Sequence, residues 1–218
     1  MTPIPIFIYG AGGHGKTLAD LLRALPDYDL LGFVDDTRPP GAQVMGVPIL
    51  GGAEALPGLR ARGVTRAVNG VGGIGHVELR LLIFDRLAEA GFTCPAVVHP
   101  RAVVDSSAWL DEGVQLLALS YVGDESHVGF GSVLNAGAIV THDCTLGRVV
   151  NLSPGAALAG GVTLADYVQV GMNATINLNV TIGTRARVGN SATVKADVPP
   201  EGVVYAGTIW PPRPRPEV

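Results

Sequence analysis

Residues 134–152 read LNAGAIVTHDCTLGRVVNL and carry an aliphatic residue at every sixth position. The period extends in both directions, so that seventeen consecutive sixth positions from Val98 to Val194 are each Val, Leu or Ile. The residue two positions before each aliphatic, from Ala102 onward, is small or β-branched. A fixed period of this kind marks a repeat architecture. The stretch therefore decides the fold of the second half of the chain.

The sixfold period predicts a parallel β-helix. Each hexapeptide forms a short strand and a corner, and three of them complete one triangular coil of 18 residues. One repeat cannot bury its own aliphatic side chain, so stacked coils supply the core. Because the period never slips between 98 and 194, we expect nearly six coils with no large insertion. Glycine often follows the aliphatic residue, where we expect a corner that favours positive φ.

The first ninety-odd residues show a different pattern. Apolar Ile4–Tyr9 is followed by a glycine-rich turn and by leucines at helical spacing. Leu30–Val34 and Arg66–Asn69 are expected strands, Val77–Ala90 is an expected amphipathic helix, and Thr37–Gly46 is an expected loop. Alternating strands and helices indicate a small parallel α/β sheet. Shorter features are a strand at 47–50 and a helical turn at 53–56.

Two phosphate-binding patterns overlap in the first glycine turn. Gly10, Gly12 and Gly15 fit the dinucleotide fingerprint, with Asp35 where a ribose-binding acid would follow. Gly10, Gly15 and Lys16-Thr17 also fit the P-loop pattern. In both cases, free amides at a helix N-terminus attract a phosphate. We therefore expect a nucleotide-containing ligand, while an NTPase, an NAD enzyme and a purely structural turn remain alternatives.

Composition narrows the class of protein. The formal net charge of −4 argues against a nucleic-acid partner. No run of 18 apolar residues is present, so no membrane span is expected, and the short apolar start is no signal peptide. We expect a cytoplasmic protein. Two cysteines make no disulfide framework, and Cys144 falls on an inward position, which favours a buried core thiol.

The whole chain resembles the bacterial nucleotide-sugar N-acetyltransferases that join a small Rossmann-like domain to a left-handed β-helix. This family also contains sialic acid O-acetyltransferases. The resemblance covers residues 6 to about 207. It rests on Ile8–Lys16, Gly32–Asp36, Val98–Pro100, Asn135–Cys144 and Ser153–Gly155, of which the His-Asp-Cys stretch within hexapeptides is specific.

The resemblance implies a reaction and a set of site residues. Acetyl-CoA is the donor, bound along the helix between subunits of a homotrimer. The acceptor is a nucleotide-linked amino sugar, with 4-amino-4,6-dideoxy sugars the closest match, held by the N-terminal domain. His142 is the general base, Asp143 tunes it, and the Gly160 amide contacts the thioester oxygen. Two departures are Asn151, where members often have histidine, and Gly207–Pro211, which replaces the usual Gly-x-Pro-Ala ending.

We therefore predict an α/β plus all-β chain with three parts. Residues 1–96 form a Rossmann-like nucleotide-sugar-binding domain, residues 97–200 a left-handed β-helix that binds acetyl-CoA, and residues 201–218 a Pro-rich tail. The candidate acceptor-binding residues are Gly12, Gly13, His14, Lys16, Asp35 and Asp36. No metal is expected.

Histidine chemistry supports the same assignment. An amine acceptor is largely protonated at neutral pH, so a base must remove a proton as its nitrogen attacks the thioester. His142 follows an inward residue by two positions and should lie at an outward corner. His127 should face solvent, while His99 and His76 lie at element boundaries. Gly160 is 18 residues beyond His142, one full coil, so the two should stack at about the spacing of paired strands, ~4.8 Å.

Other functions remain open at this point. O-acetylation of a sugar uses the same residues. A β-helix metalloenzyme would need three converging imidazoles, and His127 and His142 are 15 residues apart rather than 18. A non-catalytic nucleotide-sensing scaffold would explain the glycine turn but not a corner histidine beside an acid.

Overall fold

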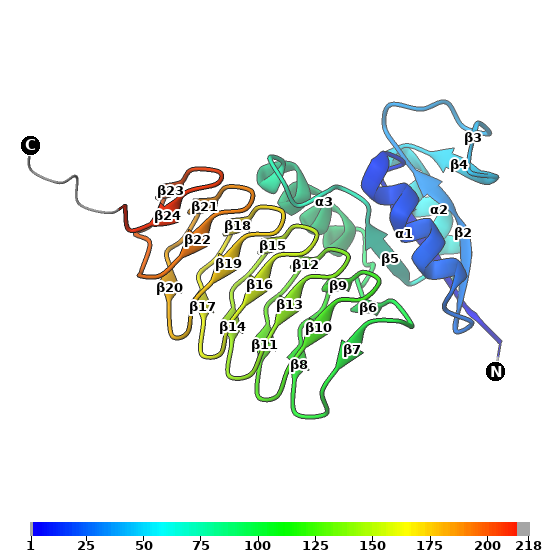
Figure 1. The fold of residues 1–218 in the computed structure, drawn as a ribbon. Coiled ribbons are helices and arrows are strands. Elements are labelled where there is room, and N and C mark those ends of the chain that lie inside the picture. Colours follow the sequence, from blue (N-terminus) through cyan, green and yellow to red (C-terminus); the bar gives the residue numbers. More distant parts are fainter. Residues whose placement is uncertain (1, 213–218) are drawn as a thin grey trace, which may run out of the picture. The chain divides into compact units, whose positions relative to one another are not determined.

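The computed structural model describes residues 2–212 and divides the chain into two compact units, Met1–Pro100 and Arg101–Val218 (Figure 1). Within the described residues, no helix is both long and apolar enough to cross a membrane.

The first unit is a Rossmann-like sheet with helices. Its sheet has the order β3-β4-β2-β1-β5, parallel except for β3. The strands are β1 (Ile4–Tyr9), β2 (Tyr28–Val34), β3 (Gln43–Val44), β4 (Val47–Gly51) and β5 (Arg66–Asn69). The helices are α1 (Gly13–Arg23), the 3-10 turn η1 (Ala53–Ala55), α2 (Leu56–Ala61) and α3 (Val77–Glu89), and β6 (Val97–Val98) ends the unit. The strand order changes direction between β1 and β5, and such a switch point is where open α/β sheets bind ligands.

The strands and helices expected in this unit are present. The bounds predicted for β1 and β5 agree with the structure, because a glycine-rich turn follows each strand and marks its end. The one strand missed is β3, within the expected loop at 37–46. It has only two residues and depends on antiparallel pairing with β4, which local sequence does not reveal.

The second unit is a left-handed parallel β-helix with three faces. One face contains β7 (Val103–Val104), β10 (Tyr121–Val122), β13 (Ile139–Val140), β16 (Ala157–Leu158), β19 (Thr175–Ile176), β22 (Thr193–Val194) and β24 (Ile209–Trp210). The next contains β8 (Trp109–Leu110), β11 (His127–Val128), β14 (Thr145–Leu146), β17 (Thr163–Leu164) and β20 (Thr181–Ile182). The strands of this unit on the third face are β9 (Gln115–Leu116), β12 (Val133–Leu134), β15 (Asn151–Leu152), β18 (Gln169–Val170), β21 (Arg187–Val188) and β23 (Val203–Val204).

The repeat aliphatics fill the interior as predicted. All fourteen from Leu116 to Val194 are buried, and each pairs in register with the residue 18 positions away. Val104 and Leu110 are only half-buried because β7 and β8 are the outermost strands of their faces. The uniform register allows a residue's coil neighbours to be read directly from the sequence.

The expected role of the corner glycines is wrong. Positive φ occurs at the third residue after each repeat aliphatic from Leu110 to Val188, continuously from Gly113 to Ser191, and not at the residue directly after it. Glycine directly after the aliphatic has another cause. A Cβ at Gly129, for example, would lie 2.6 Å from the carbonyl oxygen of Gly147 in the next coil. The stacked corners simply leave no room for a side chain.

The β-helix also continues beyond Val194, contrary to the predicted tail. β23 pairs with β21 and β24 pairs with β22, in register with residues 16 rather than 18 positions earlier. A single corner is two residues shorter, so the next inward residue is Val198, and a search at a fixed sixfold step cannot find it. Residues 213–218 of the predicted tail lie outside the described residues.

Candidate active site

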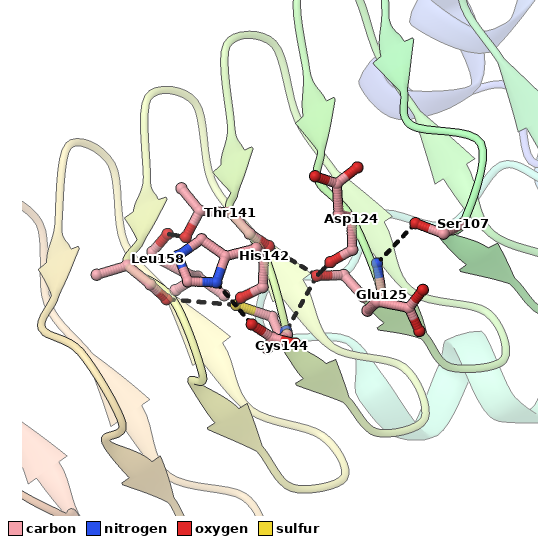
Figure 2. Close-up of polar contacts among 10 residues, drawn as sticks. Ser107, Asp124, Glu125, Thr141, His142, Cys144 and Leu158 are labelled. Atoms are coloured by element: carbon pink, nitrogen blue, oxygen red, sulfur yellow. Dashed lines mark hydrogen bonds and ion pairs between the residues drawn. The ribbon is translucent and has the colours of Figure 1, made fainter.

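The candidate active site is the corner between β13 and β14 (Figure 2). The corner comprises residues Thr141 to Cys144. His142 and Asp143 are exposed to solvent, whereas Cys144 is buried inside the β-helix. The side chain of His142 is 60% exposed, and its Nδ1 lies 2.7 Å from Oδ2 of Asp143. The expected outward corner histidine is therefore present and pairs with the acid that follows it.

The hydrogen bond between His142 and Asp143 has a defined direction. An ionised carboxylate can only accept hydrogen bonds, so Nδ1 of His142 must donate to Asp143. In the neutral imidazole this fixes the proton on Nδ1 and leaves the lone pair of Nε2 available. The corner can thus present a base at Nε2.

The backbone favours this pairing. Asp143 has φ +59°, in the left-handed region where aspartate is among the residues most readily accepted. Its amide donates to the carbonyl oxygen of Asp124 in the preceding coil at 2.9 Å. The regular corner geometry therefore holds the carboxylate beside the imidazole.

Gly160 lies directly against His142. A Cβ built on Gly160 would be 2.3 Å from Cε1 and 2.5 Å from Nε2 of the His142 ring. The one-coil spacing thus brings the two residues into contact, as the sequence predicts. Among residues 2–212, the amide of Gly160 donates no hydrogen bond to the protein. An amide donor and a basic nitrogen therefore lie within one small space.

Cys144 is buried, as expected of its inward position. It is 0% exposed, and its Sγ lies 3.3 Å from the carbonyl oxygen of Ala159. Burial raises the pKa of the thiol, despite the opposing effect of the Val162 amide. A protonated, inaccessible thiol cannot serve as a nucleophile at neutral pH.

His127 forms a second histidine–acid pair on the face that contains β11. Its Nε2 lies 2.9 Å from Oδ1 of Asp111, which also accepts a hydrogen bond from the Trp109 indole. It is thus paired rather than simply solvated. Within residues 2–212, no group of three His, Cys, Asp or Glu side chains is arranged to hold a metal ion.

Asn151 occupies a different face from His142. It is 2% exposed, and its amide group lies in hydrogen-bond distance of Asn135 and Ser153. Within this chain it therefore acts as part of a buried amide cluster on β15.

The glycine turn before α1 forms as expected. Gly12 is the N-cap residue, and α1 has neither a side-chain cap nor an acidic residue in its first turn. Within residues 2–212, the amides of Gly12 and Gly13 donate no hydrogen bond to the protein. His14 and exposed Lys16 belong to the same turn. Such a helix start attracts an anion.

Two further glycines of the turn have packing roles. Gly10 has φ +109°, and a Cβ on Gly15 would be 2.0 Å from the Gly10 carbonyl oxygen. Gly10 also contacts Gly70, the first residue of a second glycine-rich loop after β5. That loop is held by Arg80 of α3, which is fully buried and donates to the Val71 carbonyl oxygen. Burial lowers the pKa of Arg80 to about 9.

Asp35 holds the glycine turn in place. Its Oδ2 accepts from the Ala11 amide at 2.7 Å, and its Oδ1 accepts from the amide and hydroxyl of Thr37. Burial raises the pKa of Asp35, but the hydrogen bonds from Thr37 and Ala11 outweigh it and lower the pKa below its usual value. Both carboxylate oxygens therefore already have protein donors.

Asp36 is engaged in the same way. Its Oδ2 accepts from the Tyr9 hydroxyl at 2.8 Å and from Arg86 of α3 at 2.9 Å, and its Oδ1 accepts from the Ala53 amide at 2.8 Å. Sequence reasoning missed Tyr9 and Arg86, because their separation along the chain hides the contact. Asp35 and Asp36 are expected to bind the ligand. In the structure, each instead accepts hydrogen bonds from the protein and holds a loop in place.

A hexapeptide β-helix that presents a histidine–carboxylate pair at a corner, preceded in the chain by a Rossmann-like unit, defines an acetyltransferase of the hexapeptide-repeat class. Residues 5–87 match the family model of the PglD N-terminal domain. The chain is similar to perosamine N-acetyltransferase from Caulobacter crescentus, solved as a histidine-to-asparagine mutant with CoA and GDP-perosamine. That match has 33% identity, covers 98% of this chain and 97% of that one, and gives a TM-score of 0.87.

Two other solved structures are also similar to the chain over most of its length. The acetyltransferase domain of PglB from Neisseria gonorrhoeae, in complex with acetyl coenzyme A, is 31% identical, with 94% of this chain and 98% of that one covered and a TM-score of 0.85. WeeI from Acinetobacter baumannii is 25% identical, with 94% and 97% covered and a TM-score of 0.79. The chain belongs to the nucleotide-sugar N-acetyltransferases of the hexapeptide-repeat family.

Proposed function

We propose that this chain transfers the acetyl group of acetyl-CoA to the amino group of a nucleotide-linked 4-amino-4,6-dideoxy sugar. The observation that carries the proposal is the His142–Asp143 pair in contact with Gly160. The similarity to perosamine N-acetyltransferase, solved with CoA and GDP-perosamine, supports the donor and the kind of acceptor.

His142 acts as the general base. Its Nε2 removes a proton from the sugar amine as the nitrogen attacks the thioester carbonyl carbon and the C–N bond forms. The oxygen that becomes negative accepts a hydrogen bond from the Gly160 amide. Collapse of the intermediate breaks the C–S bond, and the imidazolium returns its proton to the departing thiolate, giving CoA and the amide. Asp143 keeps the Nδ1 proton in place and stabilises the imidazolium.

The first unit binds the nucleotide part of the acceptor. The uncapped start of α1, with the amides of Gly12 and Gly13, suits the phosphates, and His14 and Lys16 lie in the same turn. Asp35 contributes by holding the Ala11 amide and so the shape of this turn. Asp36 contributes in the same indirect manner through Tyr9 and Arg86.

The proposal extends to assembly and location. The β-helix carries exposed aliphatic residues such as Val103, Leu119 and Ile139, which suit burial between copies, and we propose a homotrimer. We place the reaction in the cytoplasm because its donor, acetyl-CoA, is formed there.

The test is a direct assay of the purified protein with acetyl-CoA and a panel of GDP-, UDP- and dTDP-linked 4-amino sugars, read by mass spectrometry. We expect one acetylated sugar nucleotide that survives hydroxylamine, as an amide does and an ester does not. The matching hydroxy sugars should give no product. A hydroxylamine-labile product would instead establish O-acetylation, and nucleotide-sugar binding without turnover would favour a sensing module.

A further inference from the structure

A buried serine supports the corner that carries His142. Ser126 lies in the coil before Cys144 and is 1% exposed. Its Oγ donates to the carbonyl oxygen of Thr141 at 2.7 Å and accepts from the amide of Cys144 at 3.0 Å. These are the two ends of the corner that contains His142 and Asp143, shown in Figure 2 with Thr141 and Cys144 labelled.

Most corners of the β-helix close without such a bridge. At Asn135–Ala138, for example, the amide of Ala138 donates directly to the carbonyl oxygen of Asn135 at 3.0 Å. In the His142 corner, the Ser126 hydroxyl lies between the equivalent groups. The separation of the two ends is therefore set by a side chain of the preceding coil as well as by the corner itself.

The same arrangement continues into the corner that carries Gly160. Cys144 is one coil beyond Ser126, and its Sγ lies 3.3 Å from the carbonyl oxygen of Ala159. Ser126 and Cys144 are therefore successive buried side chains beneath the two corners whose contact forms the site.

We propose that Ser126 is a positioning residue for acetyl transfer, whose hydroxyl fixes the corner so that the His142 ring meets Asp143 on one side and Gly160 on the other. The inference rests on the proposed function, because it assigns no contact between Ser126 and either substrate. Small displacements of catalytic groups are costly, since about 1 Å can lower a rate about 100-fold. A deeply buried hydroxyl whose two shortest hydrogen bonds lie on one corner, beside a longer one of 3.4 Å to the Asp124 carbonyl oxygen, can supply that precision.

The repeat itself provides suitable variants. Val114, Val150 and Val162 occupy the position equivalent to Ser126, so Ser126→Val puts into the core a residue that the repeat already accepts. It removes both hydrogen bonds to the His142 corner, together with the longer one to the Asp124 carbonyl oxygen. Ser126→Thr has nearly the shape of the valine variant but keeps the hydroxyl, so the pair isolates the hydrogen bonds from the volume change.

Ser132 is the matched control. It is 0% exposed, its Oγ donates to the carbonyl oxygen of Gly147 at 3.0 Å, and it accepts from the amide of Val150 at 2.9 Å. The corner it bridges carries Arg148 and belongs to a different edge of the β-helix. Ser132→Val therefore removes the two equivalent hydrogen bonds from a corner that is not part of the proposed site.

The experiment measures kcat, both KM values and the pH profile of kcat/KM for these variants. We expect Ser126→Val to lower kcat at least about tenfold, with both KM values within about twofold and a shifted acidic limb of the profile. Ser126→Thr should restore kcat to within about threefold of wild type, and Ser132→Val should stay within about twofold.

Several results would overturn the inference. The first is a kcat of Ser126→Val equal to that of wild type. The second is a loss of kcat in Ser132→Val as large as the loss in Ser126→Val. The third is a folded Ser126→Thr whose kcat does not recover. If Ser126→Val does not fold, Ser126→Ala is judged by the same criteria, because alanine also occurs at this repeat position. His142→Asn measured in parallel separates the two hypotheses. If that variant keeps full kcat, the proposed base is wrong, whatever Ser126 does.

Discussion

Replacing Gly160 with alanine perturbs the site through a single methyl group. The new Cβ would lie 2.3 Å from Cε1 of His142, so the ring must withdraw by about 1.1 Å to reach the 3.4 Å of an ordinary contact. The backbone itself accepts a Cβ, because Ala118, Ala136 and Ala206 occupy the equivalent corner position and φ at Gly160 is not positive. The Gly160 amide is retained. The change therefore moves the base while keeping the amide donor.

The expected cost follows from that displacement. A shift of about 1 Å costs about 100-fold in rate, or about 2.7 kcal/mol in activation free energy. Because the His142 side chain is 60% exposed, it can rotate away at little cost in folding. We expect the free energy of unfolding of Gly160→Ala to stay within about 1 kcal/mol of wild type.

The assay is a double-mutant cycle in kcat with His142→Ala. If the methyl group acts by displacing the imidazole, Gly160→Ala should cost little further rate once His142 has been removed. Gly160→Ala with kcat within about threefold of wild type would refute the geometric reasoning. An equal loss in both backgrounds would show that the methyl group obstructs the thioester instead.

Three further predictions concern the rest of the chain. Asp35 has a lowered pKa, so its carboxylate stabilises the folded state above the unfolded pKa of 3.8, and this contribution is lost as pH falls through the folded pKa. Asp35→Asn should therefore be less stable than wild type in urea unfolding at about pH 7, with the gap closing below about pH 3, and a gap independent of pH would contradict this. Buried Cys94 and Cys144 should react with iodoacetamide only after unfolding, and rapid native labelling of Cys144 with matching loss of activity would contradict the assigned inert role. Light scattering should give three times the chain mass of 22.5 kDa, and a stable monomer at micromolar concentration would exclude the trimer.

The sequence predicts the β-helix well because its core is periodic. One inward aliphatic per hexapeptide fixes register, and register alone brings His142 and Gly160 together. The same method fails after Val194, where one shorter corner moves the inward position to Val198. The sixfold period does not predict where the register shifts, and the shift can be recognised only from the strands that follow it.

Side-chain partnerships are less accessible from sequence. The aspartates after β2 match a ligand-binding pattern, yet Asp36 is held by Tyr9 and Arg86, which lie 27 and 50 residues away along the chain. Ser126 looks like any small residue of the repeat, and only the structure shows that its hydroxyl bridges the corner that carries His142. The sequence suggests that glycine follows the aliphatic residue because of positive φ, whereas the close approach of the next coil is the reason.

The most direct test of the central claim is the pH–rate profile of His142→Asn beside His127→Asn. The two histidines belong to one β-helix and both pair with an aspartate at 2.7 to 2.9 Å, so His127 is a close control. We expect His142→Asn to remain folded, to lose about 10²–10⁴ in kcat and to lose the acidic limb of its profile, while His127→Asn resembles wild type. Near wild-type kcat for His142→Asn between about pH 6 and 9 would show that the base lies elsewhere.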